Sequence, residues 1–227
     1  MSITLTATKT DSQIQQDVLR ELKWDPRVDE TEVGVQVKKG IVTLTGTVTS
    51  YAKRHAAAEA AHRVSNVLDV ANDLQVRIPG IGRKTDAEIA DAARRAMLWD
   101  VFVPDDRIRT TVSDGWITLE GEVDRWTQRE DAERAIRNLA AVAGVVNRIT
   151  VQAPRADTEE IRSAIEGALE RQAEREGRRI AVDVRDGAVT LTGAVRSWGE
   201  RNAVEQAAGY APGVRKVESR LVVDSCM

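Results

Sequence analysis

Few residues of this chain have the types and spacing that chemistry requires. Its two histidines, His55 and His62, are seven residues apart, so they share one side of a helix over two turns. A zinc pair on a helix usually has i, i+4 spacing and a third ligand nearby. We therefore interpret both histidines as members of a solvated helix face, and we predict no metal site.

The sequence also lacks the usual arrangements of catalytic residues. Carboxylates are abundant but alternate with basic residues, as in 130–137 and 171–179, which is typical of solvated helix faces. Gly80 and Gly82 lack the third glycine of a phosphate-binding loop, and Cys226 is the only cysteine. No combination of serine, histidine and aspartate recurs. We predict a protein that is not an enzyme and that holds no cofactor.

The charge balance of the chain limits the classes of ligand that it is expected to bind. Its 227 residues include 33 Lys and Arg and 36 Asp and Glu, for a net charge of −3. Nucleic acid is therefore not expected as the main ligand, because binding a polyanion needs clustered, uncompensated cations.

The first ten residues lack the pattern of a secretory signal, and the longest apolar stretch, 139–146, is too short to span a bilayer. We expect a cytoplasmic protein rather than a periplasmic one.

One segment occurs three times in the chain. The strings GIVTLTGTV, GWITLEGEV and GAVTLTGAV begin at Gly40, Gly115 and Gly187, which are 75 and 72 residues apart. The match extends in both directions and predicts three tandem modules, at 11–78, 86–151 and 158–223, joined by short linkers at 79–85 and 152–157. Basic and acidic residues number 9 and 10 in the first module, 9 and 13 in the second, and 11 and 11 in the third. Residues 1–10 form either an extra edge strand or a loose tail.

Each module changes its apolar period twice. Apolar residues at i, i+4 and i+8 predict an amphipathic helix that begins at Asp11, Asp86 and Thr158, residue types that accept hydrogen bonds from a first turn. Strict alternation predicts a strand next, at 33–37, 108–112 and 180–184. The dipeptides at 39–40, 114–115 and 186–187 follow, and Asp-Gly favours the positive φ angles of a two-residue hairpin turn.

The second strand of each hairpin carries a glycine on its predicted inward face, at Gly46, Gly121 and Gly193. Glycine weakens a strand unless another part of the chain approaches closely. The helix expected next has a stripe of small residues, such as Ala57, Ala60 and Ala61 in the first module. We therefore expect the backbone of this helix to cross the sheet at the glycines.

A final strand closes each module, with apolar residues such as Val70 and Leu74 in the first. A strand, helix and strand connection is right-handed, and it leaves the last strand parallel to the second when the two are neighbours. The sequence thus predicts an α+β fold of three tandem αββαβ modules. Each module is expected to form a three-stranded mixed sheet covered on one face by two helices.

A polar residue recurs in the closing strand, at Asn72, Asn147 and Ser219, with the strand parity of the core residues. An inward polar group must be hydrogen-bonded, or it costs about 1–3 kcal/mol. Two interpretations remain open for these candidate inward polar residues. Either the side chain bonds backbone groups of a neighbouring loop or helix end, or it belongs to a ligand or ion site.

An aromatic residue and an arginine also recur together, three residues apart, at the start of the second helix. The pairs are Tyr51 with Arg54, Trp126 with Arg129, and Trp198 with Arg201. Such pairs suit a lipid headgroup interface, where amphipathic rings and guanidinium groups are both stable. Equally, the ring covers the edge of the core while the arginine stem packs on it. Trp24 and Trp99, at the end of the first helix, have the same two interpretations.

The order of Trp24-DPRV, the glycine-centred hairpin, an alanine-rich helix and the closing strand at Asn72-DLQV resembles the BON (bacterial OsmY and nodulation) domain in all three modules. The third module departs most, with Arg171 in the place of Trp24 and Trp99, and with Ser219 in the place of the asparagines. The resemblance implies a non-enzymatic, stress-associated protein that binds phospholipid headgroups or envelope components. The alternative is an adaptor that binds a small ion, a small ligand or another protein in grooves between the modules.

Overall fold

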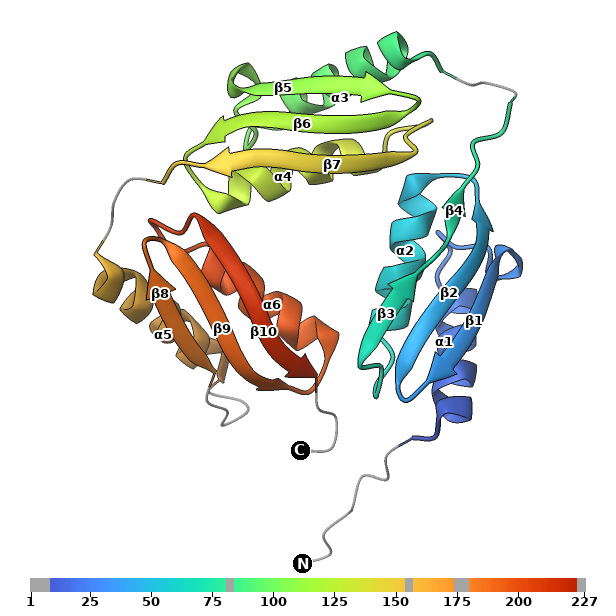
Figure 1. The fold of residues 1–227 in the computed structure, drawn as a ribbon, viewed down its shortest axis with the longest axis horizontal. Coiled ribbons are helices and arrows are strands. Elements are labelled where there is room, and N and C mark those ends of the chain that lie inside the picture. The colour runs from blue at the N-terminus through green and yellow to red at the C-terminus, as the bar shows by residue number, and fades with distance from the viewer. Residues whose placement is uncertain (1–8, 81–83, 154–156, 174–179, 224–227) are drawn as a thin grey trace, which may run out of the picture.

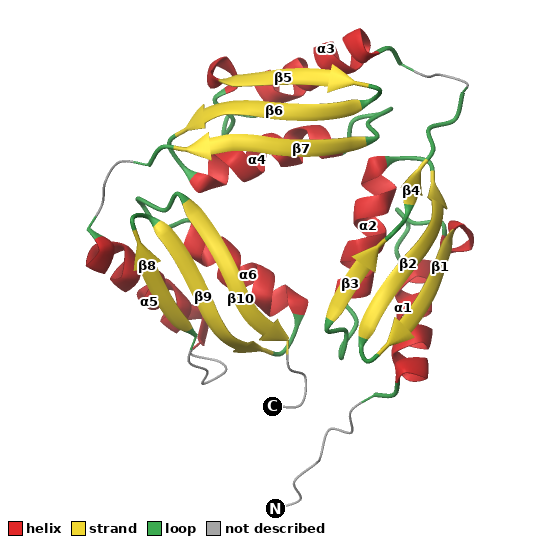
Figure 2. Ribbon diagram, viewed as in Figure 1, coloured by secondary structure: helices red, strands yellow, loops and turns green. Residues whose placement is uncertain are grey.

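The computed structural model describes residues 9–80, 84–153, 157–173 and 180–223. Along these residues, the succession of helix, two strands, helix and closing strand occurs three times (Figure 1, Figure 2). The predicted fold class is confirmed, since each module has a mixed sheet and two helices. The predicted edge strand or tail at 1–10 falls, up to residue 8, outside the described residues, and so does Cys226.

The three modules have matching elements. Module 1 contains α1 (Asp11–Trp24), β1 (Val33–Lys38), β2 (Ile41–Val48), α2 (Tyr51–His62), β3 (Asp69–Asn72) and β4 (Gln75–Val76). Module 2 contains α3 (Asp86–Trp99), β5 (Ile108–Ser113), β6 (Trp116–Val123), α4 (Trp126–Arg137) and β7 (Gly144–Val151). Module 3 contains α5 (Thr158–Ala173), β8 (Ala181–Arg185), β9 (Ala188–Val195), α6 (Trp198–Gly209) and β10 (Lys216–Val223). Short 3-10 turns, η1 (Glu30–Glu32) and η2 (Asp105–Arg107), precede β1 and β5.

Each sheet has the predicted mixed pairing. In module 1, β2 pairs antiparallel with β1 and parallel with β3, so that Leu44 lies between Val35 and Asn72. The strands β6 and β9 have the same central place in modules 2 and 3. The closing strand is continuous in β7 and β10, whereas in module 1 it is divided into β3 and β4, which both pair with β2.

The hairpin turns have the predicted conformation. Lys39 and Gly40 have φ angles of 53° and 74°, and the Asp-Gly turns of modules 2 and 3 are alike. The carboxylate of Asp11 accepts hydrogen bonds from the backbone N–H groups of both turn residues, at 2.8 and 2.9 Å. The helix cap itself lies one residue before the predicted position, at Thr10. Asp11 therefore fastens the start of α1 to the hairpin instead of capping the helix.

The valine and leucine residues of the second strands face inward as predicted, but Gly46 and Gly193 are exposed, and our reason for the glycines is wrong. Gly46 and Gly121 have φ angles of +128° and +147°, which residues with a Cβ rarely adopt. A Cβ on either glycine would collide with a backbone carbonyl, that of Glu32 or Arg107, where the preceding strand begins. The close approach is thus made by the neighbouring strand end and its 3-10 turn, and not by a helix.

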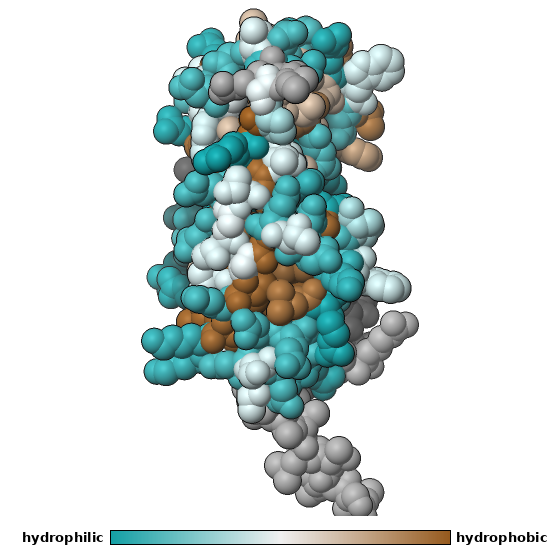
Figure 3. All heavy atoms as spheres, turned by 90° about the vertical axis from the view of Figure 1, so that its right-hand side faces the viewer, coloured by the Kyte–Doolittle hydropathy of each residue, from teal (hydrophilic) through white to brown (hydrophobic). Residues whose placement is uncertain are grey.

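Each module encloses its own apolar core. In module 1 the core brings the stripe of α1 against the inward residues of β2 and against the fully buried Ala57, Ala60 and Ala61 of α2. The side of the molecule on which β1 and α1 lie is mostly hydrophilic, with its largest apolar area near the middle of the view (Figure 3). Within the described part of the chain, no helix combines the length and the hydropathy that a membrane span needs.

The three modules surround a common centre (Figure 1). The helices α2, α4 and α6 lie toward this centre, whereas α1, α3 and α5 lie on the outer side of their modules. The closing strands β3, β7 and β10 are the inner edges of the three sheets. The second helix of every module is thereby brought close to those of the other two.

Candidate functional site

The first residue of each inner helix packs against the next module, and we call these three contacts the seams. At the first seam, Tyr51 of module 1 packs on the core of module 2, and its backbone N–H donates to the carbonyl of Val142, with 3.3 Å between N and O. Burial raises the pKa of the Tyr51 hydroxyl. The sequence patterns are compatible with a Tyr51 side chain at a lipid interface or at the edge of its own core. In the structure this side chain instead covers the core of a neighbouring module.

At the second seam, Trp126 of module 2 packs on the core of module 3. It lies directly over Gly209 at the end of α6, where a Cβ would collide with the indole ring. The repeat places His62 and Arg137 at the position of Gly209 in the other two modules. Glycine at this position therefore makes room for the larger ring of Trp126.

The third seam joins the last module to the first. The indole Nε1 of Trp198 donates a hydrogen bond to the carbonyl of Val67 at 3.1 Å. The ring of His62 stacks on Trp198, with 4.1 Å between ring centroids, and the guanidinium of Arg201 lies 4.5 Å from the indole centroid. Val67 and Val142 occupy the same place in the repeat. The seams thus close the three modules into a ring.

The recurring arginines and asparagines form one structural motif in modules 1 and 2. Asn72 donates from Nδ2 to the carbonyl of Arg54 at 2.9 Å, and Arg54 donates from its guanidinium to the carbonyl of Asn72 at 3.0 Å. Asn147 and Arg129 exchange the same two bonds, at 2.9 and 3.3 Å. These contacts tie the inner helix to the closing strand, as in the first of our two interpretations of the asparagines.

Module 3 departs from this motif. The hydroxyl of Ser219 is buried without a hydrogen-bond partner among the described residues. Arg201 instead pairs with Glu205 at 2.9 Å and covers Trp198. The module with the serine thus uses its arginine at a seam and not against the closing strand.

The three modules surround a half-open cavity of about 720 Å³ whose walls come from α2, α4 and α6. His55, Glu59 and His62 face it from α2. Thr127, Glu130 and Arg134 are among the lining residues from α4, and Asn202, Gln206 and Tyr210 are among those at α6. Because each module supplies one wall, the cavity exists only when the seams are closed. A pocket of this volume is of the size that small molecules occupy.

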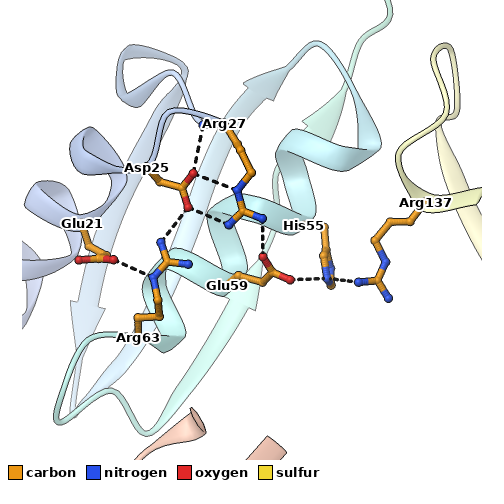
Figure 4. Close-up of polar contacts among 7 residues, drawn as sticks. All are labelled: Glu21, Asp25, Arg27, His55, Glu59, Arg63 and Arg137. Carbon is orange, nitrogen blue, oxygen red and sulfur yellow. Dashed lines mark hydrogen bonds and ion pairs between the residues drawn. The ribbon is translucent and has the colours of Figure 1, made fainter. Parts of the chain in front are cut away.

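A network of charged groups runs from the outer helix of module 1 to the cavity (Figure 4). Asp25, which is only 5% exposed, pairs with Arg27 at 2.8 Å and with Arg63 at 2.7 Å. The hydrogen bonds from Arg27 and Arg63 hold the pKa of the Asp25 carboxyl well below its usual range. Arg63 also pairs with Glu21, and Arg27 with Glu59. These pairs fix the end of α1 against α2.

The network crosses the first seam through His55. Its Nε2 lies 3.1 Å from Glu59 on the same helix and 2.6 Å from the guanidinium of Arg137 in module 2. Burial, together with the charge of Arg137, lowers the pKa of His55. The neutral ring therefore accepts a hydrogen bond from Arg137. The histidines that we interpreted as a solvated face are instead half-buried at two of the seams.

The outer end of α3 carries a second feature, which we call the apolar tip. Trp99 is 86% exposed, and Leu98, Val101 and Phe102 beside it are 64%, 89% and 70% exposed. Trp24, at the matching position of module 1, is 83% exposed but has Lys23, Pro26 and Arg27 as its neighbours in the repeat. The pattern of recurring tryptophans found Trp99. It missed the other three residues because they do not recur, although a run of large apolar residues outside any predicted core face was the available signal.

Among the described residues, no group of three or more His, Cys, Asp or Glu side chains is arranged to hold a metal ion.

Comparison with known proteins supports the resemblance drawn from the repeat. The family model for the BON domain matches three times, at residues 10–78, 85–153 and 157–225. The chain belongs to the BON domain family. This assignment agrees with three copies of the αββαβ unit in one chain.

Among curated proteins, this BON protein is similar to the osmotically-inducible protein Y of Escherichia coli (strain K12). The two are 28% identical over 141 residues, which cover 60% of this chain and 70% of the relative. Two solved structures of CdsD, a structural protein of the Type III secretion system of Chlamydia trachomatis, match at 15% and 14% identity. They cover 93% and 95% of this chain and 92% and 100% of their own, and both have a TM-score of 0.26, which supports no structural argument.

Proposed function

We propose that this BON protein is a non-catalytic, stress-associated protein that docks on phospholipid surfaces through the apolar tip of module 2. Stress association is supported by the similarity to an osmotically-inducible protein. Docking is supported by the tip itself, since four large apolar side chains within five consecutive residues are exposed to solvent. Contiguous exposed apolar residues mark interaction sites more often than single ones do.

The physical basis of docking is insertion and not charge attraction. Burying a large apolar side chain contributes about 1.5–3 kcal/mol, so that two or three inserted rings and aliphatic groups are enough for reversible binding. Module 2 has 9 basic and 13 acidic residues and is therefore not attracted to an anionic bilayer as a whole. Indole and aliphatic groups at the end of a helix suit the boundary between headgroups and acyl chains. Binding should thus depend weakly on salt.

Vesicle co-sedimentation tests this proposal. The protein should sediment with phosphatidylcholine and phosphatidylglycerol vesicles at low and at physiological salt, and Trp99→Ala with Phe102→Ala should abolish sedimentation. Trp24→Ala is the matched control, since Trp24 is equally exposed but lacks apolar neighbours. Binding should survive that change. Loss of binding in the control, or sedimentation unaffected by the double change, would overturn the role of the tip.

A further inference from the structure

The central cavity has features that the docking proposal does not use. Its walls belong to three modules, and its volume of about 720 Å³ lies in the range of small-ligand sites. It is a separate site from the apolar tip, because none of the four tip residues lines it.

The charges around the cavity are already compensated by one another. Arg134 pairs with Asp131 at 2.6 Å, and the other three arginines of the lining, Arg63, Arg137 and Arg201, also have carboxylate partners. The four lining carboxylates are likewise paired, Asp131 and Glu205 with the lining arginines Arg134 and Arg201, Glu59 with Arg27 and Glu130 with Arg129. Burial lowers the pKa of both lining histidines, which keeps them neutral. A charged ligand would have to break existing ion pairs, whereas a neutral ligand would not.

The wall made by α6 supplies hydrogen-bonding groups that are not in use. Asn202 and Gln206 are four residues apart and therefore on one face of the helix, and within the described part of the chain their amides have no hydrogen-bond partner. The buried Nε2 of His62 is also without a partner among the described residues. Each amide presents donors and an acceptor at once, as does the neutral imidazole. The ring of Tyr210, which is 72% exposed, lies beside them.

We propose that the cavity binds a neutral polyhydroxylated ligand, that is, a sugar or a sugar alcohol. A hydroxyl group both donates and accepts, so adjacent hydroxyls match the paired donors and acceptors of Asn202 and Gln206. Hydroxyls also bond to guanidinium and carboxylate groups without disrupting their ion pairs. The apolar face of a sugar ring suits the exposed ring of Tyr210. Free sugars and glycan chains share this chemistry.

Isothermal titration calorimetry with defined probes tests the proposal on the full chain. Trehalose, sorbitol and the glycan oligomer chitotetraose are the uncharged probes, and the charged ones are glucose 6-phosphate, an anion, and glycine betaine, a zwitterion. The probes are used far below the concentrations at which excluded osmolytes stabilise proteins in general. At least one neutral probe should bind saturably and more tightly than both charged probes. Tighter binding of chitotetraose than of trehalose would identify a glycan chain as the source, and the reverse would identify a free sugar.

Variants connect the binding to the cavity. Changing Asn202→Ala together with Gln206→Ala should weaken binding about tenfold or more, since two hydrogen bonds are lost. Both residues are exposed to the cavity, so the fold should persist, which a melting curve checks. Gln36→Ala, an exposed amide on β1, is the matched control and should bind as wild type does. The proposal is overturned by no saturable binding of a neutral probe, by tighter binding of a charged probe, or by an unchanged affinity of the double variant.

Discussion

Gly121 shows how strongly a single backbone position constrains each module. Its φ of +147° is strained for any residue with a Cβ, and a Cβ there would also collide with the carbonyl of Arg107. The glycine is needed because β6 must bend past the start of β5, to which it is paired at Ile108. The same conformation occurs at Gly46 and Gly193. The recurrence of glycine in the strand is thus explained by its own φ angle and by a neighbouring backbone carbonyl, and not by a helix that packs on it.

The change Gly121→Val tests this explanation. The strained φ alone should destabilise module 2 by about 1–3 kcal/mol, and the collision adds to that cost. Because each module has its own core, urea denaturation should show an early partial transition followed by unfolding of the other two modules. Glu122→Val, at the exposed neighbouring position, is the control and should melt as wild type does. A Gly121→Val protein with the wild-type transition would contradict the backbone explanation.

The inner helices are the elements that convert three modules into one assembly. The N-terminus of α2 meets the loop that follows α4, the N-terminus of α4 meets the end of α6, and the N-terminus of α6 meets the end of α2 and the loop that follows it. Three large rings at equivalent positions make these contacts, but their acceptors differ. Val142 accepts from a backbone N–H, Val67 accepts from an indole, and Gly209 provides a flat surface for a ring.

The change Gly209→Ala should open the second seam while leaving module 3 folded. The added Cβ would collide with the indole of Trp126, which must then leave the core of module 3. Small-angle X-ray scattering should show a larger radius of gyration, and circular dichroism should show unchanged helix content. Gly199→Ala is the matched control on the same helix, because its Cβ would meet only Ser197 Oγ at 3.7 Å. Equal dimensions for the two variants would rule out the role of Gly209 in the seam.

At the scale of the whole molecule, closure of the ring is linked to protonation. His55 lies between Arg137 on α4 and Glu59 on its own helix, with Glu133 of α4 also acting on it. Burial and Arg137 lower the pKa of His55 in the folded protein, and burial also lowers the pKa of His62 at the third seam. Protonation places a cation against Arg137 and favours Glu59 as the partner of His55. Acid should therefore loosen the first seam.

The sign of the pH dependence follows from these pKa values. A histidine whose pKa is lowered by folding binds more protons in the unfolded chain, whose histidines titrate at about 6.5. Its contribution to stability is thus present above about pH 6.5 and is lost as the pH falls below that value. Melting temperatures should decrease from about pH 7.5 to about pH 5.5. Replacing His55 and His62 by Gln should reduce this decrease, and an equally steep decrease in that variant would assign it to other groups.

The sequence alone determined the number of modules, the order of their elements and the inward faces of their strands. These features depend on periodicity and on turn residues such as Asp114 and Gly115, whose preferences act within a few positions of the chain. Only the tertiary structure decided what Tyr51, Trp126 and Trp198 contact, where His55 and His62 lie, and that a cavity exists. Each of these depends on how three separately folded cores meet. The spacing of these aromatic residues in the sequence is the same whether their rings are exposed or buried by a neighbouring module. Their burial depends on contacts between residues that are far apart along the chain, and the spacing does not show those contacts.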